Sequence, residues 1–593
     1  MVMTSTFVSK VGSVDRFLIR YGWLLLAALS ASYYALYFNH GLALAGEGGT
    51  TAVYAMRLME GQRPIADTFL GYNVLWFYPV ALVFQFTGPD YLALRAFFFG
   101  LCLLTAVLAW WTVLRVTRSG LLALGTGFVV ALIPGMMFRN YMGLMPVANQ
   151  LVLISAFLLP TRGTRTRILL MGLSGAVLGL TFLIRIEVGI LVSVIWVGLF
   201  ILYPLMPGGG FRLRLQEALV GGLISLLALL AVHAPFAADA HRRGYAKDFY
   251  GQYSSFVGLF RWELEKQTAS WRRPPPSAKI PPDLVEAPAG APPASVVGIN
   301  DGRRKRPSAS EIFTGRKSRD RYYAAAIYVP VLLSLAFVAV ATAGFFGSYW
   351  WRNAGIWTDS LTSLILVGCS LTLLPQYLFF RPDTPHITEF MVPFIVALVC
   401  GVALLIRRAA ASGSRPVRIL AAVASVSLVI QIWIHFGHAW PKESAGTVAA
   451  RKGTTAEFVG LNGVRVRVTP ERAVALAGLQ EAIVRNSRPE DWVVCLPYSP
   501  TINFMTDRPS YLWDLYTDNT MAGSDFDKAR IAEIEKYDPA VVVIDHRAIN
   551  SSEASRFPNW APGLYSHLQE TFDRVGDYAG NEVFVRRKNE PTP

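Results

Sequence analysis

The chain has 593 residues, of which 53% are hydrophobic and only 16% are charged, and its mean hydropathy is +0.38. Soluble globular proteins carry about 25% charged residues, so this composition excludes an ordinary soluble protein. The net charge of +15 does not indicate a nucleic-acid partner, because many basic residues lie in short loops between apolar segments and no basic-aromatic module of the nucleic-acid-binding kind stands out.

Apolar runs of about twenty residues recur along the first 440 positions, and each is long enough to cross a ~30 Å hydrocarbon core. The residues before Tyr21 lack the short apolar core of a cleaved signal, so the first run is expected to be a retained span. The chain is therefore predicted to be a polytopic α-helical membrane protein with about 11–13 spans. The twelve apolar segments are 21–38, 72–88, 95–114, 121–137, 145–160, 167–184, 187–205, 213–236, 323–346, 358–380, 388–406 and 416–437.

Two polar stretches break or follow this series. Residues 237–322 contain a Pro-rich run that cannot be helix or central strand and is expected to form an extended or disordered outer loop. Residues 440–593 have a soluble composition in which strand patterns alternate with helix patterns, which predicts a small α/β domain. Residues 1–437 form the membrane module in this scheme, with 42–71 as a first outer loop that carries a surface helix.

Cysteine usage adds no structural site. Three of the four cysteines lie in apolar runs and the fourth lies in the C-terminal region, so neither a disulfide framework nor a zinc site is predicted.

The short basic loops predict which side each segment faces. Lys and Arg stay on the cytoplasmic side, and the richest basic loops are the N-terminal tail, 115–120, 161–167 and 407–418. Placing these four in the cytoplasm puts the first loop, the Pro-rich loop and the C-terminal domain outside together. The same count requires residues 72–114 to cross an odd number of times, so one of the two runs drawn there is expected to be re-entrant or to lie along the membrane.

The first loop contains "EGGTTAVYAMRLMEG" (47–61), in which apolar residues repeat at helical spacing before a terminating Gly61. A short amphipathic helix in the membrane interface is expected, with Glu47 at its N-terminus, where the helix dipole favours an ionised carboxylate. Such a group can take the proton of an attacking hydroxyl. The plainer alternative is that Glu47 only starts the helix and that Asp67, in "PIADTF", only occupies a turn.

This loop and the aromatic, Pro-containing run after it resemble the opening of the GT-C glycosyltransferases, which include protein mannosyltransferases, aminoarabinose transferases and arabinofuranosyltransferases. The resemblance implies a polytopic enzyme that takes a sugar from a polyprenyl-phosphate carrier. It also implies that the first-loop acid, here Glu47, is the catalytic base. Many members have Asp where this chain has Gly46, so Asp67 competes for the role.

"FLIRIEVGIL" places Arg185 and Glu187 between two apolar runs, where a charge is costly unless it is paired or faces water. Two residues apart, they do not face each other on a helix, so an intrahelical pair is a poor explanation. The resemblance implies a carrier-phosphate site at Arg185, a role that suits the fork-shaped guanidinium, with Glu187 in support. An ion pair with another loop is the alternative.

"FFRPDTPHITEF" places Arg381, Asp383 and His386 in a tight turn between apolar runs. This resembles a pattern of GT-C relatives, in which Arg381 and His386 would bind the lipid-linked phosphate and Asp383 would orient one of them. A purely structural turn is the alternative. A metal site lacks a third local ligand, so no metal and no cofactor are predicted.

Two further segments supply weaker candidates. Arg139, in "MMFRNYMGLMP", would line the sugar pocket or belong to an ordinary polar loop. Tyr498, Tyr511 and Trp513, in the C-terminal domain, would stack on sugar rings of an acceptor or belong to the core of that domain.

Together these features predict an inverting glycosyltransferase of the bacterial inner membrane, with its active site and C-terminal domain facing the periplasm. Its partners would be a polyprenyl-phosphate sugar, a glycan, lipid or protein acceptor, and membrane lipids. The alternative is a transporter or flippase for lipid-linked sugars. That alternative predicts charges near the bilayer midplane and an internal repeat, whereas the candidate charges lie at span ends.

Overall fold

The computed structural model describes most of the chain. The described residues are 2–68, 72–132, 138, 140–159, 163–206, 210–254, 318–350, 354–375, 384–412, 414–438, 448, 451–517, 521–548 and 553–587. They divide into two compact units. The first unit takes Met1–Tyr37, Phe98–Asp239 and Pro307–Val448, and the second takes Phe38–Phe97, Ala240–Arg306 and Ala449–Pro593.

The first unit is helical throughout its described residues. Its helices are α1 (Val2–Ala35), α4 (Tyr91–Thr117, from Phe98 onwards), α5 (Gly120–Leu132), α6 (Tyr141–Phe157), α7 (Thr164–Ile184), α8 (Ile186–Leu202), α9 (Phe211–Arg242), α12 (Ser318–Trp350), α13 (Ala354–Leu371), α14 (Thr384–Ser412) and α15 (Arg415–His438). In the described part of the chain, seven helices are long and apolar enough to cross a membrane. The prediction of a polytopic α-helical membrane protein is confirmed, while the number of crossings stays a prediction.

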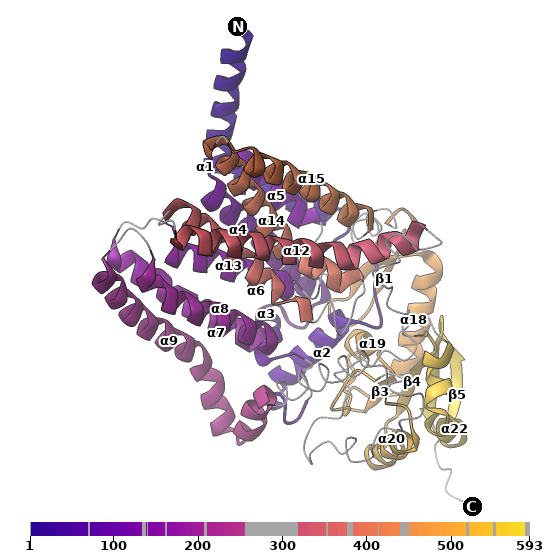
Figure 1. The fold of residues 1–593 in the computed structure, drawn as a ribbon. Helices are drawn as coiled ribbons and strands as arrows, with labels where there is room; N and C mark the ends of the chain where they lie inside the picture. The colour runs from indigo at the N-terminus through magenta and orange to yellow at the C-terminus, as the bar shows by residue number, and fades with distance from the viewer. Residues whose placement is uncertain are drawn as a thin grey trace, which may run out of the picture. The chain divides into compact units, whose positions relative to one another are not determined.

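Close backbone approach holds α7 and α9 together. A Cβ on Gly175 would lie 2.0 Å from the carbonyl oxygen of Ser225, and one on Gly221 would lie 2.2 Å from the sulfur of Met171. Small residues at such positions let membrane helices approach closely where lipid gives no hydrophobic drive for association. The contacts advance along both helices together, so α7 and α9 run in the same direction, and α8 returns beside them (Figure 1).

The second unit holds α2 (Glu47–Met59), η1 (Val74–Trp76), α3 (Tyr78–Thr87) and the C-terminal domain. The predicted run 72–88 forms only the ten-residue helix α3, about 15 Å long, which is too short to cross a ~30 Å core. It packs against α2 within this unit. Of the two runs drawn over 72–114, only α4 is long enough to cross, which agrees with the odd number that the basic loops predict, and the crossing itself stays a prediction.

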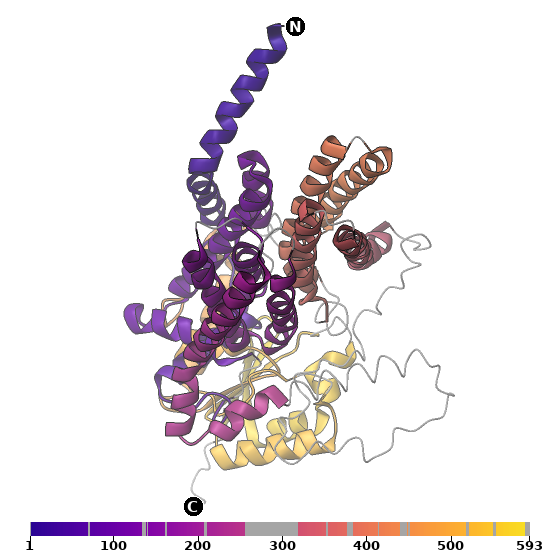
Figure 2. The same ribbon diagram turned by 60° about the vertical axis from the view of Figure 1, so that its left-hand side comes forward.

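The C-terminal domain is built on a four-stranded sheet in the order β3-β4-β6-β5. β3 (Val493–Leu496) and β4 (Val541–Asp545) are parallel, whereas β6 (Asn581–Arg586) runs antiparallel to both β4 and β5 (Phe572–Asp577). Figure 2 gives a second view of this domain, in orange to yellow. The helices around the sheet are α18 (Pro470–Arg485), α19 (Pro500–Thr506), α20 (Ser524–Tyr537), α21 (Phe557–Trp560) and α22 (Pro562–Thr571).

The α/β prediction for this domain is confirmed at its main elements. Three predicted strands appear as β3, β4 and β6, and two predicted helices appear as α18 and α20. β3 and β4 are buried along their whole lengths, which explains their continuous apolar runs. The hairpin of β1 (Ala456–Val459) and β2 (Arg465–Val468) was not predicted, because each strand has only four residues and the alternation of charged and apolar residues is therefore short.

Candidate functional site

The first loop forms a helix at the predicted place. α2 begins at Glu47, directly after Gly46, whose φ of +128° is a conformation that favours glycine. It ends at Met59, and Gly61 follows with a φ of +88°. Glu47 is therefore the first helical residue, where unpaired backbone N–H groups and the helix dipole favour a negative charge.

The surroundings of α2 differ from the expected helix on a membrane surface. Gly48 to Ala55 are all buried, because α2 packs against α3 on one side and α19 of the C-terminal domain on another. A Cβ on Gly49 would lie 2.2 Å from the hydroxyl oxygen and 2.4 Å from the backbone nitrogen of Thr501. α2 and α19 thus touch backbone to backbone, and only glycine fits at the contact.

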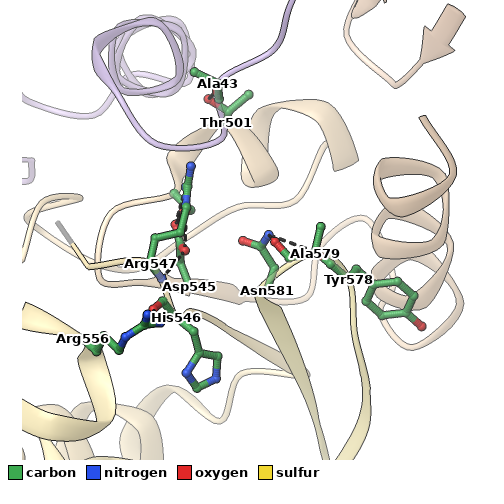
Figure 3. Close-up of polar contacts among 10 residues, drawn as sticks. Ala43, Thr501, Asp545, His546, Arg547, Arg556, Tyr578, Ala579 and Asn581 are labelled. Carbon is green, nitrogen blue, oxygen red and sulfur yellow. Dashed lines mark hydrogen bonds and ion pairs between the residues drawn. The ribbon is translucent and has the colours of Figure 1, made fainter. Parts of the chain in front are cut away.

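Thr501 also fastens the residues that lead into α2. Its backbone N–H donates to the carbonyl of Leu44 at 3.2 Å, and its hydroxyl donates to the carbonyl of Ala43 at 2.8 Å (Figure 3). Thr50 of α2 donates to the hydroxyl of Tyr498 at 3.1 Å. The C-terminal domain therefore holds both the start of α2 and the segment that precedes it.

Arg57, which the sequence did not single out, anchors α2 to the C-terminal domain. It is 4% exposed and donates to the hydroxyl of Thr68 (2.8 Å) and to the carbonyls of Leu512 (2.9 Å) and Ser510 (2.5 Å). Burial lowers the pKa of Arg57, but an arginine starts from so high a pKa that the guanidinium stays charged. Arg57 lies at helical spacing from the apolar residues of α2, so the sequence places it on the buried face of the helix. That position is the signal from which its role could have been predicted.

Asp67 lies outside this packed region and is held by a neighbour. Its carboxylate accepts from the side chain of Arg63 at 2.7 Å and from the Arg63 backbone N–H at 2.7 Å. These hydrogen bonds lower the pKa of Asp67. A carboxylate that already accepts from a guanidinium and has a lowered pKa is a weak proton acceptor.

The three aromatic candidates of the C-terminal domain have different surroundings. The ring of Tyr498 meets Tyr516 edge to face at 4.7 Å. Tyr511 stacks on Tyr537 at 4.4 Å, and burial raises its pKa, so it belongs to an aromatic cluster of the domain. Trp513 is partly exposed. The packing favours a structural role for Tyr511 and leaves Tyr498 and Trp513 as candidates.

Two satisfied carboxylates brace the sheet of this domain. At the carboxyl end of β4, Asp545 accepts from Ser499 at 3.0 Å and from the backbone and side chain of Arg547 at 2.9 Å (Figure 3). On β6, Glu582 accepts from Tyr565 (2.7 Å) and His546 (2.8 Å). Burial raises the pKa of Glu582, but these hydrogen bonds outweigh it and the pKa is lowered. The lowered pKa means that the ionised form of Glu582 stabilises the domain.

In the first unit, hydrogen bonds show which helix ends lie together. Thr181, near the end of α7, accepts from Asn149, at the middle of α6, at 2.9 Å, and its hydroxyl donates to the sulfur of Met145, near the start of α6, at 3.7 Å. α6 and α7 are therefore antiparallel, and the start of α6 lies at the same end of the bundle as the junction of α7 and α8. Asp359, near the start of α13, pairs with Arg408, near the end of α14, at 2.8 Å, so these two helices are antiparallel as well.

Arg185 and Glu187 lie at the junction of α7 and α8 and form an ion pair with each other. The pair is not the intrahelical one that the sequence disfavours, because Arg185 lies between the two helices and is extended, with φ −146° and ψ 110°. The extended residue separates the two helices and brings the side chains together. Both are nearly buried, with side-chain exposures of 13% and 10%.

His386 is a buried residue in the first turn of α14. Three other candidates, Arg381, Asp383 and Arg139, lie outside the described residues, as does the Pro-rich part of the outer loop. Within the described ranges, no three His, Cys, Asp or Glu side chains are grouped so that they could hold a metal ion.

Comparison with solved structures identifies the architecture. The chain matches the crystal structure of ArnT from Cupriavidus metallidurans bound to undecaprenyl phosphate at a TM-score of 0.50, with 13% identity over 97% of this chain and all of that one. The chain has the GT-C fold. The apo form of the same ArnT matches with a TM-score of 0.46 and 11% identity over 98% of both chains.

The GT-C fold comes from structure alone, because no protein-family model and no curated protein matches the sequence. An Archaeoglobus fulgidus oligosaccharyltransferase, solved with zinc and sulfate, has a TM-score of 0.45 and 12% identity over 95% of this chain and 73% of that one. At these identities the likeness establishes the fold, and the reaction is a separate question.

Proposed function

We propose that the protein is an inverting glycosyltransferase that moves a sugar from a polyprenyl-phosphate carrier to an acceptor hydroxyl at the outer face of a bacterial inner membrane. The observation that carries the proposal is the position of Glu47. It begins a helix whose start is fixed by backbone contacts to a folded domain, in a chain with the GT-C fold. The ArnT structure with undecaprenyl phosphate supports a carrier of that chemical class.

In the proposed reaction, the acceptor oxygen forms a bond to the anomeric carbon of the sugar while the bond from that carbon to the phosphate oxygen breaks. Glu47 takes the proton of the acceptor hydroxyl, and the electron pair leaves with the polyprenyl phosphate. Arg185, Arg381 and His386 neutralise the charge that develops on this phosphate, with Asp383, Glu187 and Arg139 in support. The leaving group is already a phosphate ester, so the proposal needs no metal.

Glu47 is preferred to Asp67 as the base on chemical grounds. A base must have a lone pair available, and the Asp67 carboxylate accepts two hydrogen bonds from Arg63, which lower its pKa. Glu47 instead begins a helix, where the helix dipole favours an ionised carboxylate.

An in vitro transfer assay with a panel of polyprenyl-phosphate sugars tests the proposal. Glu47→Gln should lower kcat by about 10²–10⁴-fold, the usual contribution of a general base, with little change in donor KM. Asp67→Asn is the matched control and should keep activity within a few-fold. Inert wild-type protein with every donor, or full activity of Glu47→Gln, would overturn the proposal.

The role of Arg185 is tested in the same assay by a different readout. Arg185→Lys keeps the charge but loses the fork geometry, so donor KM should rise while kcat changes less. Because Arg185 pairs with Glu187, the Glu187→Gln variant separates the two functions of the arginine. If Arg185 acts only as a structural pair, both variants will lower the melting temperature equally and leave donor KM unchanged.

A further inference from the structure

The helices α7 and α9 both begin with arginines at one end of the first unit. Arg165 and Arg167 are among the first four residues of α7, and Arg212 and Arg214 are among the first four of α9. Both helices are long and apolar enough to cross a membrane, so their first residues are expected at its boundary with water. The sequence thus puts four cations at the depth where lipid headgroups lie.

The two helix starts lie side by side (Figure 1). The hydroxyl of Thr164 donates to the carboxyl group of Glu217 at 2.7 Å, which joins the start of α7 to the second turn of α9. Farther along, Gly221 of α9 approaches Met171 of α7 so closely that an added Cβ would lie 2.2 Å from its sulfur. The arginines of both helices therefore gather at the same end of one helix pair.

Tyr203, directly after α8, holds two of these arginines together. The guanidinium carbons of Arg167 and Arg214 lie 5.6 Å and 5.9 Å from the centre of its ring, and Arg167 donates to its hydroxyl at 2.5 Å. The hydroxyl in turn donates to Glu217. Tyr203 is buried, so this cluster fixes the ends of three helices relative to one another from inside the protein.

Arg165 and Arg212 are the exposed members of the group, and they are the cations that the cluster presents at the surface. The sequence around them has a large excess of positive charge. Residues 160–167 and 207–217 contain five arginines and a single acidic residue, Glu217. The excess therefore remains whether or not Glu217 is ionised, and it attracts an anion.

Apolar side chains continue from the arginines along the outside of both helices. Leu169 and Leu173 of α7 are exposed, as are Leu219 and Leu223 of α9. Only 11% of the apolar window of α9 is buried inside the protein, so this helix presents most of its apolar surface to its surroundings. Exposed cations followed directly by exposed apolar surface match a molecule with an anionic headgroup and apolar tails.

We propose that the starts of α7 and α9 form a binding site for one anionic phospholipid. Arg165 and Arg212 hold its phosphate through charge-assisted hydrogen bonds, and its acyl chains lie along the exposed leucines of the two helices. This site is separate from the one proposed for the carrier phosphate. Arg185 follows the other end of α7, which has 21 residues, so about 30 Å of helix lies between Arg165 and Arg185. The inference goes beyond the proposed function and does not depend on it.

Native mass spectrometry of the purified full-length protein in detergent tests the inference. Phosphatidylglycerol and phosphatidylcholine are titrated separately. Wild-type protein should retain one phosphatidylglycerol with roughly 10-fold or greater preference over phosphatidylcholine, and the preference should fall with rising salt. Arg165→Gln combined with Arg212→Gln should lower the affinity for phosphatidylglycerol by about 30-fold, because each basic residue near an anionic headgroup contributes about 5-fold. Binding of phosphatidylcholine should not change.

Three further measurements separate a built site from general attraction. Arg165→Lys combined with Arg212→Lys keeps both charges and should keep most of the preference. Arg115→Gln combined with Arg118→Gln is the matched control, because these arginines are also exposed and lie at the end of another apolar helix, α4, and it should leave the preference unchanged. Inorganic phosphate at the concentration of the lipid should not displace it, since phosphate alone lacks the acyl chains.

Four outcomes would overturn the inference. They are equal affinity of wild-type protein for the two lipids, unchanged affinity of the Arg165→Gln/Arg212→Gln protein for phosphatidylglycerol, an equal loss in the Arg115→Gln/Arg118→Gln protein, and displacement of the lipid by equimolar inorganic phosphate. Both substituted arginines are exposed, so the melting temperature in phosphatidylcholine should match that of wild type. Each single variant, expected to lose about 5-fold, provides the test if the double variant does not fold.

Discussion

Replacing Arg57 with methionine removes a buried cation while keeping a side chain of similar length. The change leaves two backbone carbonyls, those of Leu512 and Ser510, without their donor, and Thr68 loses its partner as well. A buried polar group left unsatisfied costs about 1–3 kcal/mol, so the two carbonyls together correspond to about 2–6 kcal/mol. The arginine is 4% exposed, so water can replace little of what is lost.

The expected result is a local loosening of α2 from the C-terminal domain. A middle value of about 4 kcal/mol corresponds to a roughly 10³-fold larger population of the open state. Hydrogen exchange read by mass spectrometry should show faster exchange in peptides covering 47–59 and 508–517. If Glu47 is the base, kcat should fall with it, because the helix that begins at Glu47 no longer has a fixed position.

Arg57→Lys and Arg63→Met serve as controls. A lysine keeps the charge but cannot reproduce the three hydrogen bonds of the fork, so it should recover only part of the protection. The side chain of Arg63 is 42% exposed and pairs with Asp67, so its loss should leave exchange in α2 unchanged. Unchanged exchange in Arg57→Met, or the same increase in Arg63→Met, would refute the reasoning.

Three further predictions concern stability. Gly49→Ala should cost about 1–3 kcal/mol and lower the melting temperature, because its Cβ would meet the backbone of α19, whereas Gly100→Ala, which meets nothing within 4 Å, should not lower it. Because the pKa of Glu582 is lowered, its charge stabilises the fold above about pH 4.3, and this contribution is lost as the pH falls through the lowered pKa. The difference in melting temperature between wild type and Glu582→Gln should therefore shrink below about pH 4. A difference that stays constant with pH would contradict this prediction. Gly175→Leu should abolish the monodisperse peak in size-exclusion chromatography, since even a Cβ would lie 2.0 Å from a backbone oxygen of α9, and wild-type elution would show that the contact is not tight.

Periodicity and run length alone predicted the long apolar helices and the main elements of the C-terminal domain. Each predicted apolar run corresponds to a helix, and the buried strands β3 and β4 were found from their continuous apolar residues. These patterns are local, and the physical cause, transfer of apolar surface out of water, acts on each segment by itself. The start of α2 at Glu47 could also be predicted from local sequence, because Gly46 precedes the helix and Gly61 follows its end.

Contacts between distant segments could not be predicted in this way. The sequence left the 72–88 run as a possible span, and only its packing against α2 assigns it to the second unit. It gave no reason to expect that Arg185 and Glu187 pair with each other, because the pair depends on one extended residue between two helices. Arg57 gave a signal, a charge on a buried helical face, but its meaning depends on the partners that tertiary structure supplies.

The sequence by itself determined that the chain is a polytopic membrane protein with an α/β domain at its C-terminus, since hydropathy and period are written residue by residue. Tertiary structure decided that the chain has the GT-C fold and that the helix beginning at Glu47 is held by Thr501 and Ser510, more than 450 residues away. It also brought Arg167 and Arg214 to the ring of Tyr203. Such pairings depend on the spatial path of the whole chain, and no local pattern encodes them.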